Sequence, residues 1–293
     1  MTLSNRGLVL GAAGIALMCS MDAVAKGLGA ELTAFQVVFV RYLGSAVWLA
    51  LWIALSRGVW PRRADLGPQA LRAVMMVATA SMFFYAVAQL PLAVVAALGM
   101  TAPLYVTLIG ALLFKEKLGP RGLMALALGA GGAAIIILGG GTLTMDRISG
   151  EWLAWAAALL APLTYAAVLG LLKHHSGKEE PAAMTLGQST IAALLVLPLA
   201  STQVPVVTTK LAALVVLIGL LGAVGFLLLV HGLRLMPVSV FAVIDYTGLL
   251  WAALLGFVFF SEVPSPQFWL GAGLIVGACL LNARGKSTES AAV

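Results

Sequence analysis

The stretch PLAVVAALGMTAPLYVTLIGALLFKEKLGPRGLMALALGAG, residues 91–131, occurs twice in this chain. A shift of 146 positions places it without a gap on PVSVFAVIDYTGLLWAALLGFVFFSEVPSPQFWLGAGLIVG, residues 237–277, and 12 of the 41 aligned pairs are identical. The identical pairs are Pro91/Pro237, Val94/Val240, Ala96/Ala242, Thr101/Thr247, Leu104/Leu250, Leu108/Leu254, Gly110/Gly256, Phe114/Phe260, Glu116/Glu262, Pro120/Pro266, Leu128/Leu274 and Gly131/Gly277. Because the shift is half the chain length, the sequence predicts two similar halves, residues 1–145 and 146–293, a common signature of transporters.

The composition is typical of a membrane protein. Hydrophobic residues make up 62% of the 293 positions, charged residues make up 10%, and the mean hydropathy is +1.07, far from the usage of a soluble domain. A helix needs roughly 20 apolar residues to cross the hydrocarbon core. We therefore predict an all-α polytopic membrane protein with ten spans, at about 7–28, 34–56, 69–88, 92–114, 121–138, 150–172, 182–200, 211–233, 238–260 and 267–283.

The positions of Lys and Arg predict how the spans are oriented. With both termini in the cytoplasm, the cytoplasmic segments carry 13 of these residues and the external segments carry 2, the bias expected in the cytoplasmic (inner) membrane. Because each half has an odd number of spans, the second half is inverted relative to the first. Two inverted halves typically enclose a central cavity and open it alternately to each side. Basic residues confined to short loops also argue against nucleic-acid binding as the reason for the net charge of +6.

Four charged residues lie within predicted spans, namely Asp22, Lys26, Arg41 and Asp245. A charge at the bilayer centre costs at least about 2.5–3.5 kcal/mol on insertion scales, so such residues normally face water or a partner. Asp22 and Arg41 lie at similar depth on adjacent spans, which leaves two interpretations: a structural ion pair, or a substrate or proton site. Lys26 lies near the end of its span and is expected to extend to the membrane surface. Asp245 has no basic neighbour in the sequence and is a candidate for proton coupling.

The repeated stretch carries a proline and two glutamates that need separate interpretation. Pro103 removes the hydrogen bond to the carbonyl of Gly99, which predicts a kink or hinge at these two residues, or a proline that packing tolerates. Its counterpart is Leu249, so the kink is not symmetric. Glu116 and Glu262 end their spans, where a carboxylate is unfavourable beside its own helix C-terminus. We expect each to reach a neighbouring helix N-terminus or a cation, as part of the architecture.

Every tyrosine lies inside a predicted span, the five being Tyr42, Tyr85, Tyr105, Tyr165 and Tyr246. A hydroxyl there needs a partner, so either a wet cavity or hydrogen bonds between helices account for them. Methionines such as Met21 and Met100 add adaptable surface, which suits a loosely selective pocket and also suits plain packing.

Other motifs, present or absent, limit the classes of function that the sequence allows. Glycine-rich patterns at 127–131 and 273–277 let helices approach closely, within the chain or across a homodimer, so we expect a monomer or a homodimer. Cys19 and Cys279 lie in apolar runs with no second ligand at metal spacing, and neither a disulfide, a metal nor a cofactor is predicted. The chain has no GxSxG and no HExxH motif, which disfavours an intramembrane enzyme. A passive channel or a non-transporting membrane subunit is the other alternative to a transporter.

The duplicated five-span unit, the proline inside span four, and the Phe-Lys-Glu and Phe-Ser-Glu endings at 114–116 and 260–262 resemble the drug/metabolite transporter superfamily. The sequence is similar to its ten-helix EamA-type exporters, and within these to the YddG-type aromatic amino acid and metabolite exporters. The resemblance implies a central cavity formed mainly by spans one, three, four, six, eight and nine. It places near that cavity Met21, Tyr85, Met100, Tyr105, Tyr165 and Asp245.

These expectations combine into one functional hypothesis. The predicted substrate cavity comprises Met21, Asp22, Tyr85, Met100, Tyr105, Tyr165, Asp245 and Tyr246. Apolar and aromatic walls would hold a side chain, while groups such as Asp22, Arg41 or Asp245 would orient a charged head group. We expect a secondary transporter in the lipid bilayer that works by alternating access. Its predicted substrates are amino acids, especially aromatic ones, or similar small metabolites, which it would export.

Overall fold

The computed structural model describes residues 5–62, 66–102, 104–105, 120–138, 145–175, 180–201, 208–235 and 244–289. This part of the chain is all helical and contains no strand. Its helices are α1 (Asn5–Leu28), α2 (Ala34–Ser56), α3 (Leu66–Gln89), α4 (Leu92–Gly99), α6 (Pro120–Leu138), α7 (Met145–His175), α8 (Pro181–Ala200), α9 (Thr209–Leu235), α11 (Thr247–Phe260) and α12 (Pro266–Glu289).

The helices account for the predicted spans. Five of them, α1, α2, α3, α8 and α9, are long and apolar enough to cross a membrane. Shorter apolar stretches lie within α6, α7, α11 and α12. Span four is described at residues 92–102 and 104–105, so Pro103, Glu116 and the part of that span after residue 105 lie outside the described residues. The prediction of an all-α polytopic membrane protein is confirmed.

Local sequence signals set where two of the helices begin. Before α2, the Thr33 side chain accepts a hydrogen bond from the Gln36 N–H, and the Gln36 side chain accepts one from the Thr33 N–H. This reciprocal capping box satisfies two backbone donors that the helix itself cannot pair. Before α8, the Glu180 carboxylate accepts from two N–H groups of the first turn, and Pro181 occupies the first helical position, where its missing N–H costs nothing.

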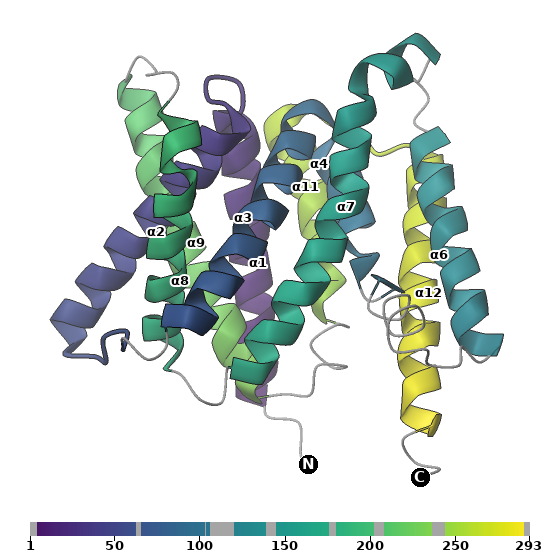
Figure 1. The fold of residues 1–293 in the computed structure, drawn as a ribbon. Helices are drawn as coiled ribbons and strands as arrows, with labels where there is room; N and C mark the ends of the chain where they lie inside the picture. The colour runs from purple at the N-terminus through teal and green to yellow at the C-terminus, as the bar shows by residue number, and fades with distance from the viewer. Residues whose placement is uncertain are drawn as a thin grey trace.

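The two halves are inverted and interlocked (Figure 1). In the repeat, α1, α2, α3, α4 and α6 correspond to α7, α8, α9, α11 and α12. The packing follows this correspondence, because α1 packs on α9 as α7 packs on α3, while α2 meets α8, α4 meets α11 and α6 meets α12. The start of α1 and the end of α12 lie at one end of the bundle, and α12 begins at the opposite end (Figure 1). Helices of the two halves therefore pack against each other, and both the single membrane domain and the boundary at 145/146 stay predictions.

Glycines let α6 and α12 approach closely, and the tightest contact uses Gly132 and Gly271, which lie just outside the two patterns that the sequence suggested. A Cβ on Gly132 would lie 2.6 Å from the carbonyl oxygen of Gly271, and a Cβ on Gly271 would lie 2.6 Å from that of Gly132. In contrast, a Cβ on Gly131, Gly273 or Gly277 would meet nothing within 4 Å. These three glycines make no close approach to the described residues, whereas a Cβ on Gly129 of the first pattern would meet Leu104 and Ala278. The expectation of packing within the chain therefore holds for Gly129 only, and the homodimer alternative stays open.

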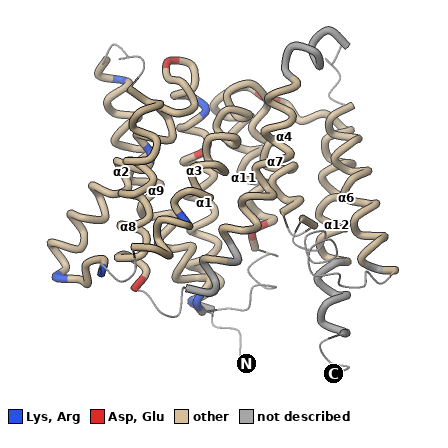
Figure 2. The backbone as a smooth tube through the Cα atoms, in the orientation of Figure 1, with Lys and Arg blue, Asp and Glu red and all other residues tan. Residues whose placement is uncertain are grey.

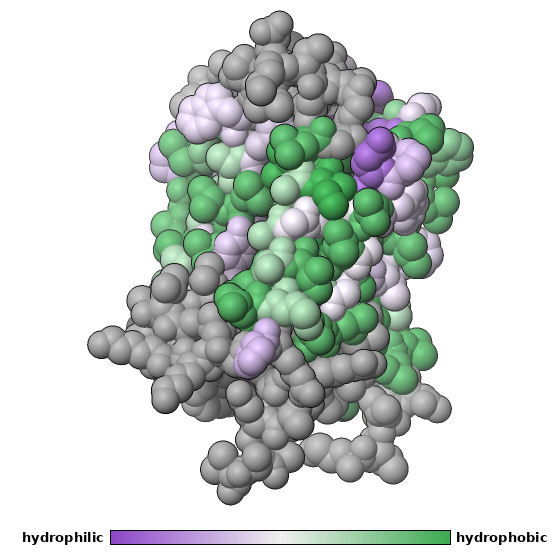
Figure 3. All heavy atoms as spheres, turned by 90° about the vertical axis from the view of Figure 1, so that its right-hand side faces the viewer, coloured by the Kyte–Doolittle hydropathy of each residue, from purple (hydrophilic) through white to green (hydrophobic). Residues whose placement is uncertain are grey.

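The outside of the bundle suits a lipid environment. Large apolar side chains such as Leu55, Leu138 and Val263 are exposed, and the described atoms on the face in Figure 3 are mostly hydrophobic. Charged residues lie mainly toward the two ends of the bundle, with few in between (Figure 2). Three of the interior charges, Asp22, Arg41 and Asp245, line the cavity described next.

Candidate substrate cavity

A cavity of about 210 Å³ lies between the two halves. It is lined by α1, α3 and α4 from the first half and by α7, α9, α11 and the residue Asp245 from the second. These helices are the six spans that the family resemblance implies. One further helix contributes, because Arg41 and Tyr42 of α2 also line the cavity.

Among the residues that the structure describes, three charged side chains line this cavity, one basic and two acidic. Arg41 is only 7% exposed, and its guanidinium lies 4.7 Å from the ring centre of Tyr42 and 5.5 Å from that of Phe84. It donates one hydrogen bond to the Tyr42 hydroxyl at 3.0 Å and contacts the Met21 sulfur at 3.1 Å. The side chain is thus held in place mainly by aromatic faces and neutral partners, which keeps its positive charge available to a ligand.

The two carboxylates of the cavity come from different halves. Asp22 lies on α1 and Asp245 just before α11, and both are half-buried. Neither forms a hydrogen bond or an ion pair with another residue that the structure describes, so Asp22 and Arg41 are not paired within 4.0 Å. Since a charge in such surroundings needs a counter-ion, a proton or water, both carboxylates are open to a ligand.

The cavity walls are otherwise apolar, with a high share of aromatic and methionine side chains. The largest of them are Met18, Met21, Met76, Phe83, Phe84, Met100, Tyr165 and Phe226. Phe83 and Phe84 form an edge-to-face pair with ring centres 5.8 Å apart. A small number of charged groups in an apolar wall is the usual composition of a small-molecule site.

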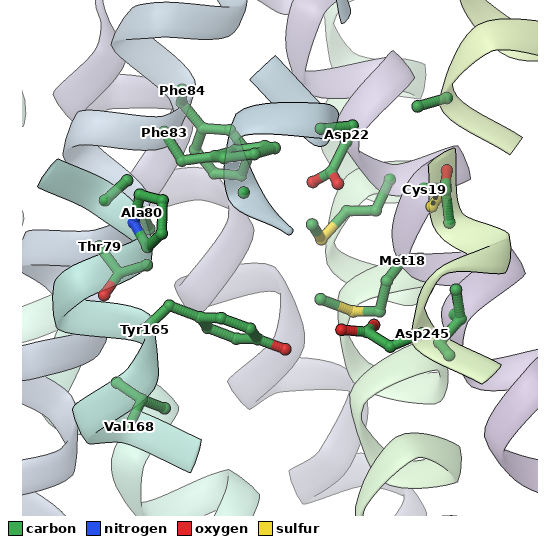
Figure 4. A pocket seen from close by; sticks show the side chains of 18 of the residues that line it. Met18, Cys19, Asp22, Thr79, Ala80, Phe83, Phe84, Tyr165, Val168 and Asp245 are labelled. Atoms are coloured by element: carbon green, nitrogen blue, oxygen red, sulfur yellow. Dashed lines mark hydrogen bonds between the residues drawn. The ribbon is translucent and has the colours of Figure 1, made fainter. Parts of the chain in front are cut away.

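Tyr165 supplies a polar group from the opposite side. Its ring extends from α7 into the cavity, with the hydroxyl directed toward Met18 and Asp245 (Figure 4). The hydroxyl makes no hydrogen bond to another described residue. One turn earlier, Pro162 lies inside α7 and cannot donate to the carbonyl of Ala158. Pro162 and Ala158 line the cavity as well.

Helix breaks place several of these groups. Span four is interrupted after Gly99, where Met100 and Thr101 form a turn before the helix resumes. Span nine is interrupted at Tyr246, between the helical residues 244–245 and α11. Met100 and Tyr246 are equivalent positions of the repeat, so the two halves break at the same register.

A threonine at each break explains how the chain tolerates it. The Thr101 hydroxyl donates to the carbonyl of Leu98 at 2.6 Å, and the Thr247 hydroxyl donates to that of Ile244 at 2.7 Å. The Thr247 hydroxyl therefore supplies a donor to the Ile244 carbonyl at its break, while the Thr101 hydroxyl adds a second donor to the Leu98 carbonyl, which also accepts from the Thr101 N–H at 3.0 Å. Both threonines belong to the identical pairs of the repeat, and the sequence analysis assigned them no role.

The structure brings most of the predicted site residues together but not all. Lining the cavity are Met21, Asp22, Arg41, Gly99, Met100, Tyr165 and Asp245. Three predicted tyrosines lie away from it. Tyr85 is 37% exposed, Tyr105 donates to the carbonyl of Leu159 at 2.7 Å, and Tyr246 contacts the Cys279 thiol. For Tyr105, a hydrogen bond between helices rather than a wet cavity accounts for the hydroxyl. The predicted hinge residue Pro103 lies outside the described residues.

Sequence reasoning missed several lining residues, chiefly Met18, Cys19, Thr79, Phe83, Phe84 and Phe226. Pro162 was also missed, although a proline inside a predicted span was a visible signal. The phenylalanines carried no such signal, because an aromatic residue in an apolar span has the same pattern whether it faces lipid, a neighbour or a cavity.

At one end of the cavity, Lys26 and Glu262 form an ion pair of 2.7 Å. Glu262 also accepts a hydrogen bond from the Leu92 N–H, at the N-terminus of α4. The expectation that Glu262 reaches a helix N-terminus or a cation is confirmed on both counts. The expectation that Lys26 extends to the membrane surface is wrong, because its side chain is 13% exposed and turned toward neighbouring helices.

Among the described residues, no group of three or more His, Cys, Asp or Glu side chains is placed to hold a metal ion. Cys19 and Cys279 are both free thiols.

Comparison with known proteins agrees with this architecture. The model of the EamA-like transporter family matches residues 5–138 and again residues 152–284. The pseudopaline exporter CntI of Pseudomonas aeruginosa strain UCBPP-PA14 is 28% identical over 270 residues, which is 91% of this chain and 92% of the exporter. A riboflavin transporter of Brucella anthropi is 25% identical, over 78% of this chain and 80% of that protein.

A solved crystal structure shows the same fold. It aligns with a TM-score of 0.62 at 18% identity and covers 94% of this chain and 95% of its own. Two matches of one family model, one on each inverted half, account for most of the sequence. The chain therefore belongs to the EamA-like transporter family of the drug/metabolite transporter superfamily.

Proposed function

We propose that this transporter exports amino acids, aromatic ones in particular, or similar small metabolites across the cytoplasmic membrane by alternating access. The observation that carries the proposal is the cavity between the two inverted halves, which combines one cation and two carboxylates with an aromatic and methionine wall. An amino acid presents the complementary groups, namely a carboxylate, an ammonium and a side chain.

The head group would bind to the charged residues. Arg41 is held with its guanidinium between neutral partners, so it suits a substrate carboxylate. Asp22 and Asp245 lack partners among the described residues and suit an ammonium group. The Tyr165 hydroxyl, directed toward Asp245 (Figure 4), adds a donor or acceptor at the same place.

The wall would bind the substrate side chain. Phe83, Phe84 and Phe226 offer faces and edges for aromatic contacts, each worth about 0.5–1.5 kcal/mol beyond the area it buries. The methionines can adjust to side chains of different shape. The cavity volume of about 210 Å³ lies below the roughly 300–1,000 Å³ usual for drug-sized ligands, which favours a small metabolite.

Alternating access is supported by the inverted halves and by the breaks in spans four and nine. Discontinuous helices beside a central site are a recurrent feature of transporters built from inverted repeats. We further propose that both termini lie in the cytoplasm, as the distribution of Lys and Arg predicts.

The test is transport into reconstituted vesicles, with a panel of radiolabelled amino acids, riboflavin and pseudopaline, the last two because of the names of relatives. We expect saturable uptake of phenylalanine, tyrosine or tryptophan, accelerated when unlabelled substrate is present inside. Such counterflow distinguishes a carrier from a passive channel. Uptake of riboflavin or pseudopaline without any amino acid would contradict the proposed substrate class, and non-saturable uptake without counterflow would contradict a carrier.

A matched pair of variants connects the transport to the cavity. Arg41→Lys keeps the positive charge but loses the planar guanidinium, so we expect the half-saturation concentration to rise about tenfold, which corresponds to about 1.4 kcal/mol. Glu31→Gln changes an exposed charge outside the cavity and should transport as the wild type does. An Arg41→Lys protein with wild-type kinetics would remove Arg41 from the binding site.

A further inference from the structure

The Lys26–Glu262 pair joins the two halves of the protein. Lys26 lies on α1 in the first half, and Glu262 follows α11 in the second. Their Nζ and Oε1 atoms are 2.7 Å apart, and the side chains are 13% and 18% exposed. It is the only ion pair within 4.0 Å among the residues that the structure describes.

The same two side chains pair backbone groups at two other helix ends. The Lys26 ammonium donates to the carbonyl of Leu90 at 2.6 Å and to that of Val87 at 3.2 Å, where α3 ends. Glu262 accepts from the N–H of Leu92 at 2.9 Å, where α4 begins. Helix C-termini favour cations and helix N-termini favour anions. One pair thus connects α1, α3, α4 and the end of α11.

The conformation of Glu262 depends on a glycine of the repeat. Its carboxylate folds back over α11, where a Cβ on Gly256 would lie 2.7 Å from Oε2. Its N–H donates to the carbonyl of the same Gly256 at 3.1 Å, and Ser261 adopts a left-handed conformation with φ 56°. The Lys26 ammonium lies 5.5 Å from the ring centre of Phe260. These contacts fix the carboxylate in front of the lysine.

The pair also lies directly at one end of the cavity. Lys26 is one helical turn beyond Asp22 on the same face of α1, and Asp22 lines the cavity. Leu92, whose N–H binds Glu262, lines it too. This is the end where α1 and α3 terminate and α12 begins (Figure 1), and the sequence predicts that it faces outside.

We propose that the Lys26–Glu262 pair is a positioning pair that holds the cavity closed at this end, and that it separates whenever the cavity opens there during transport. The physical reason is that inverted halves exchange conformations by changing the contacts between them. A partly exposed ion pair suits such a contact, because water can replace each partner when they separate. The inference rests on alternating access but not on the identity of the substrate.

Access to the cavity can be measured without a substrate, using the native Cys19 as a reporter. Cys19 lines the cavity, whereas Cys279 is buried elsewhere, so a Cys279→Ser background leaves one thiol to follow. A membrane-impermeant thiol reagent is applied separately to each side of oriented vesicles. We expect Lys26→Met and Glu262→Gln to raise the labelling rate of Cys19 about tenfold from the side of Glu262. Lys26→Arg should label nearly as slowly as the parent, and Glu31→Gln should not differ from it.

Equal labelling rates in Lys26→Met, Glu262→Gln and Glu31→Gln from that side would overturn the proposal. A second reporter, Ala96→Cys, lies on α4 in the wall of the same cavity and must give the same answer. Labelling is compared only among variants whose elution volume in detergent matches the parent.

A cross-link tests the opening step without weakening the fold. The variant Lys26→Cys/Glu262→Cys, treated with a short bifunctional thiol reagent whose link a reductant cleaves, fixes this end closed. We expect transport to fall at least tenfold and to return when the reductant is added. Full transport by the cross-linked protein would show that the pair stays closed during the cycle and would overturn the proposal. Each single-cysteine variant, treated in the same way, is the control.

Discussion

Spans four and nine are copies of each other. Comparing them separates the residues that support the helix break from the residues that determine the chemistry of the cavity. Both spans are interrupted at the same register, at Met100–Thr101 and at Tyr246. Thr101 and its copy Thr247 make the same hydroxyl-to-carbonyl bond. The shared residues therefore support the break, whereas the residues that differ set the chemistry.

The residues that differ are the proline and the charge. Leu249 stands where span four has Pro103, and span nine breaks nevertheless, so a proline at this position is not required for a break. Asp245 stands where span four has Gly99, and both line the cavity. The duplication thus produced one charged and one uncharged wall from the same backbone arrangement.

The largest expected effect comes from moving that charge between the copies. Asp245→Gly should lower the transport efficiency about 10- to 100-fold, because losing a charged hydrogen-bond partner costs about 1.5–3 kcal/mol. A Cβ on Gly99 would meet nothing within 4 Å and Gly99 lines the cavity, so this position is the one at which to place the exchanged aspartate. We expect Gly99→Asp/Asp245→Gly to recover at least part of the lost efficiency, measured as the initial rate of counterflow.

Two outcomes would contradict this interpretation. Wild-type transport by Asp245→Gly would show that the carboxylate takes no part in binding. A double variant that folds but transports no better than Asp245→Gly would show that the two walls are not equivalent. Glu31→Gln, with an exposed carboxylate outside the cavity, is the control for a general effect of charge.

The sequence predicted the fold because hydropathy, charge bias and an ungapped repeat are independent of side-chain orientation. Ten spans and the inversion of the halves follow from these signals alone. The repeat also identified Glu262 as architectural, since a carboxylate at its own helix C-terminus needs a partner elsewhere. The structure supplied what the sequence could not, namely that this partner includes Lys26.

The site was predicted less completely, for a physical reason. In a soluble helix, polar residues mark the outward face, but in an apolar span both lipid and cavity tolerate aromatic side chains. Tyr165 and Tyr85 therefore look alike in sequence, yet one enters the cavity and the other is exposed. A kink in span four was predicted at Gly99 and Pro103, but the break in span nine was missed, because a threonine can pair a carbonyl of its own helix without changing the hydropathy of the span.

A smaller effect is expected at those threonines. Thr101→Val and Thr247→Val each remove one hydroxyl donor from a carbonyl at a break, which should lower the stability by about 1 kcal/mol. The midpoint of thermal unfolding in detergent would fall by about 2–4 °C. The decrease should be larger for Thr247→Val, because in Thr101→Val the Leu98 carbonyl keeps the N–H of residue 101 as a donor.

The control is Thr190→Val, where the hydroxyl donates to the Leu186 carbonyl four residues earlier within the uninterrupted helix α8. Since the helix already supplies a donor to that carbonyl, we expect little change. A loss at Thr190 as large as at the breaks would mean that the hydroxyls at 101 and 247 have no special role. A loss at only one break would show that the two copies are held differently.

The smallest change in stability is expected for Gly99→Ala. This variant tests whether span four needs the backbone flexibility of a glycine at that position. Gly99 is the last helical residue of α4, and a Cβ there would meet nothing within 4 Å. Alanine is favoured over glycine in a helix by up to about 1 kcal/mol, so Gly99→Ala should leave the unfolding midpoint equal or slightly higher. Gly132→Ala is the matched control, because its Cβ would lie 2.6 Å from the backbone oxygen of Gly271, and the midpoint should fall.

If Gly99 acts as a hinge, as its place before the break suggests, Gly99→Ala will slow counterflow in a protein of undiminished stability. Unchanged counterflow would assign the movement to the turn at Met100–Thr101 alone, and span four would then move as span nine does.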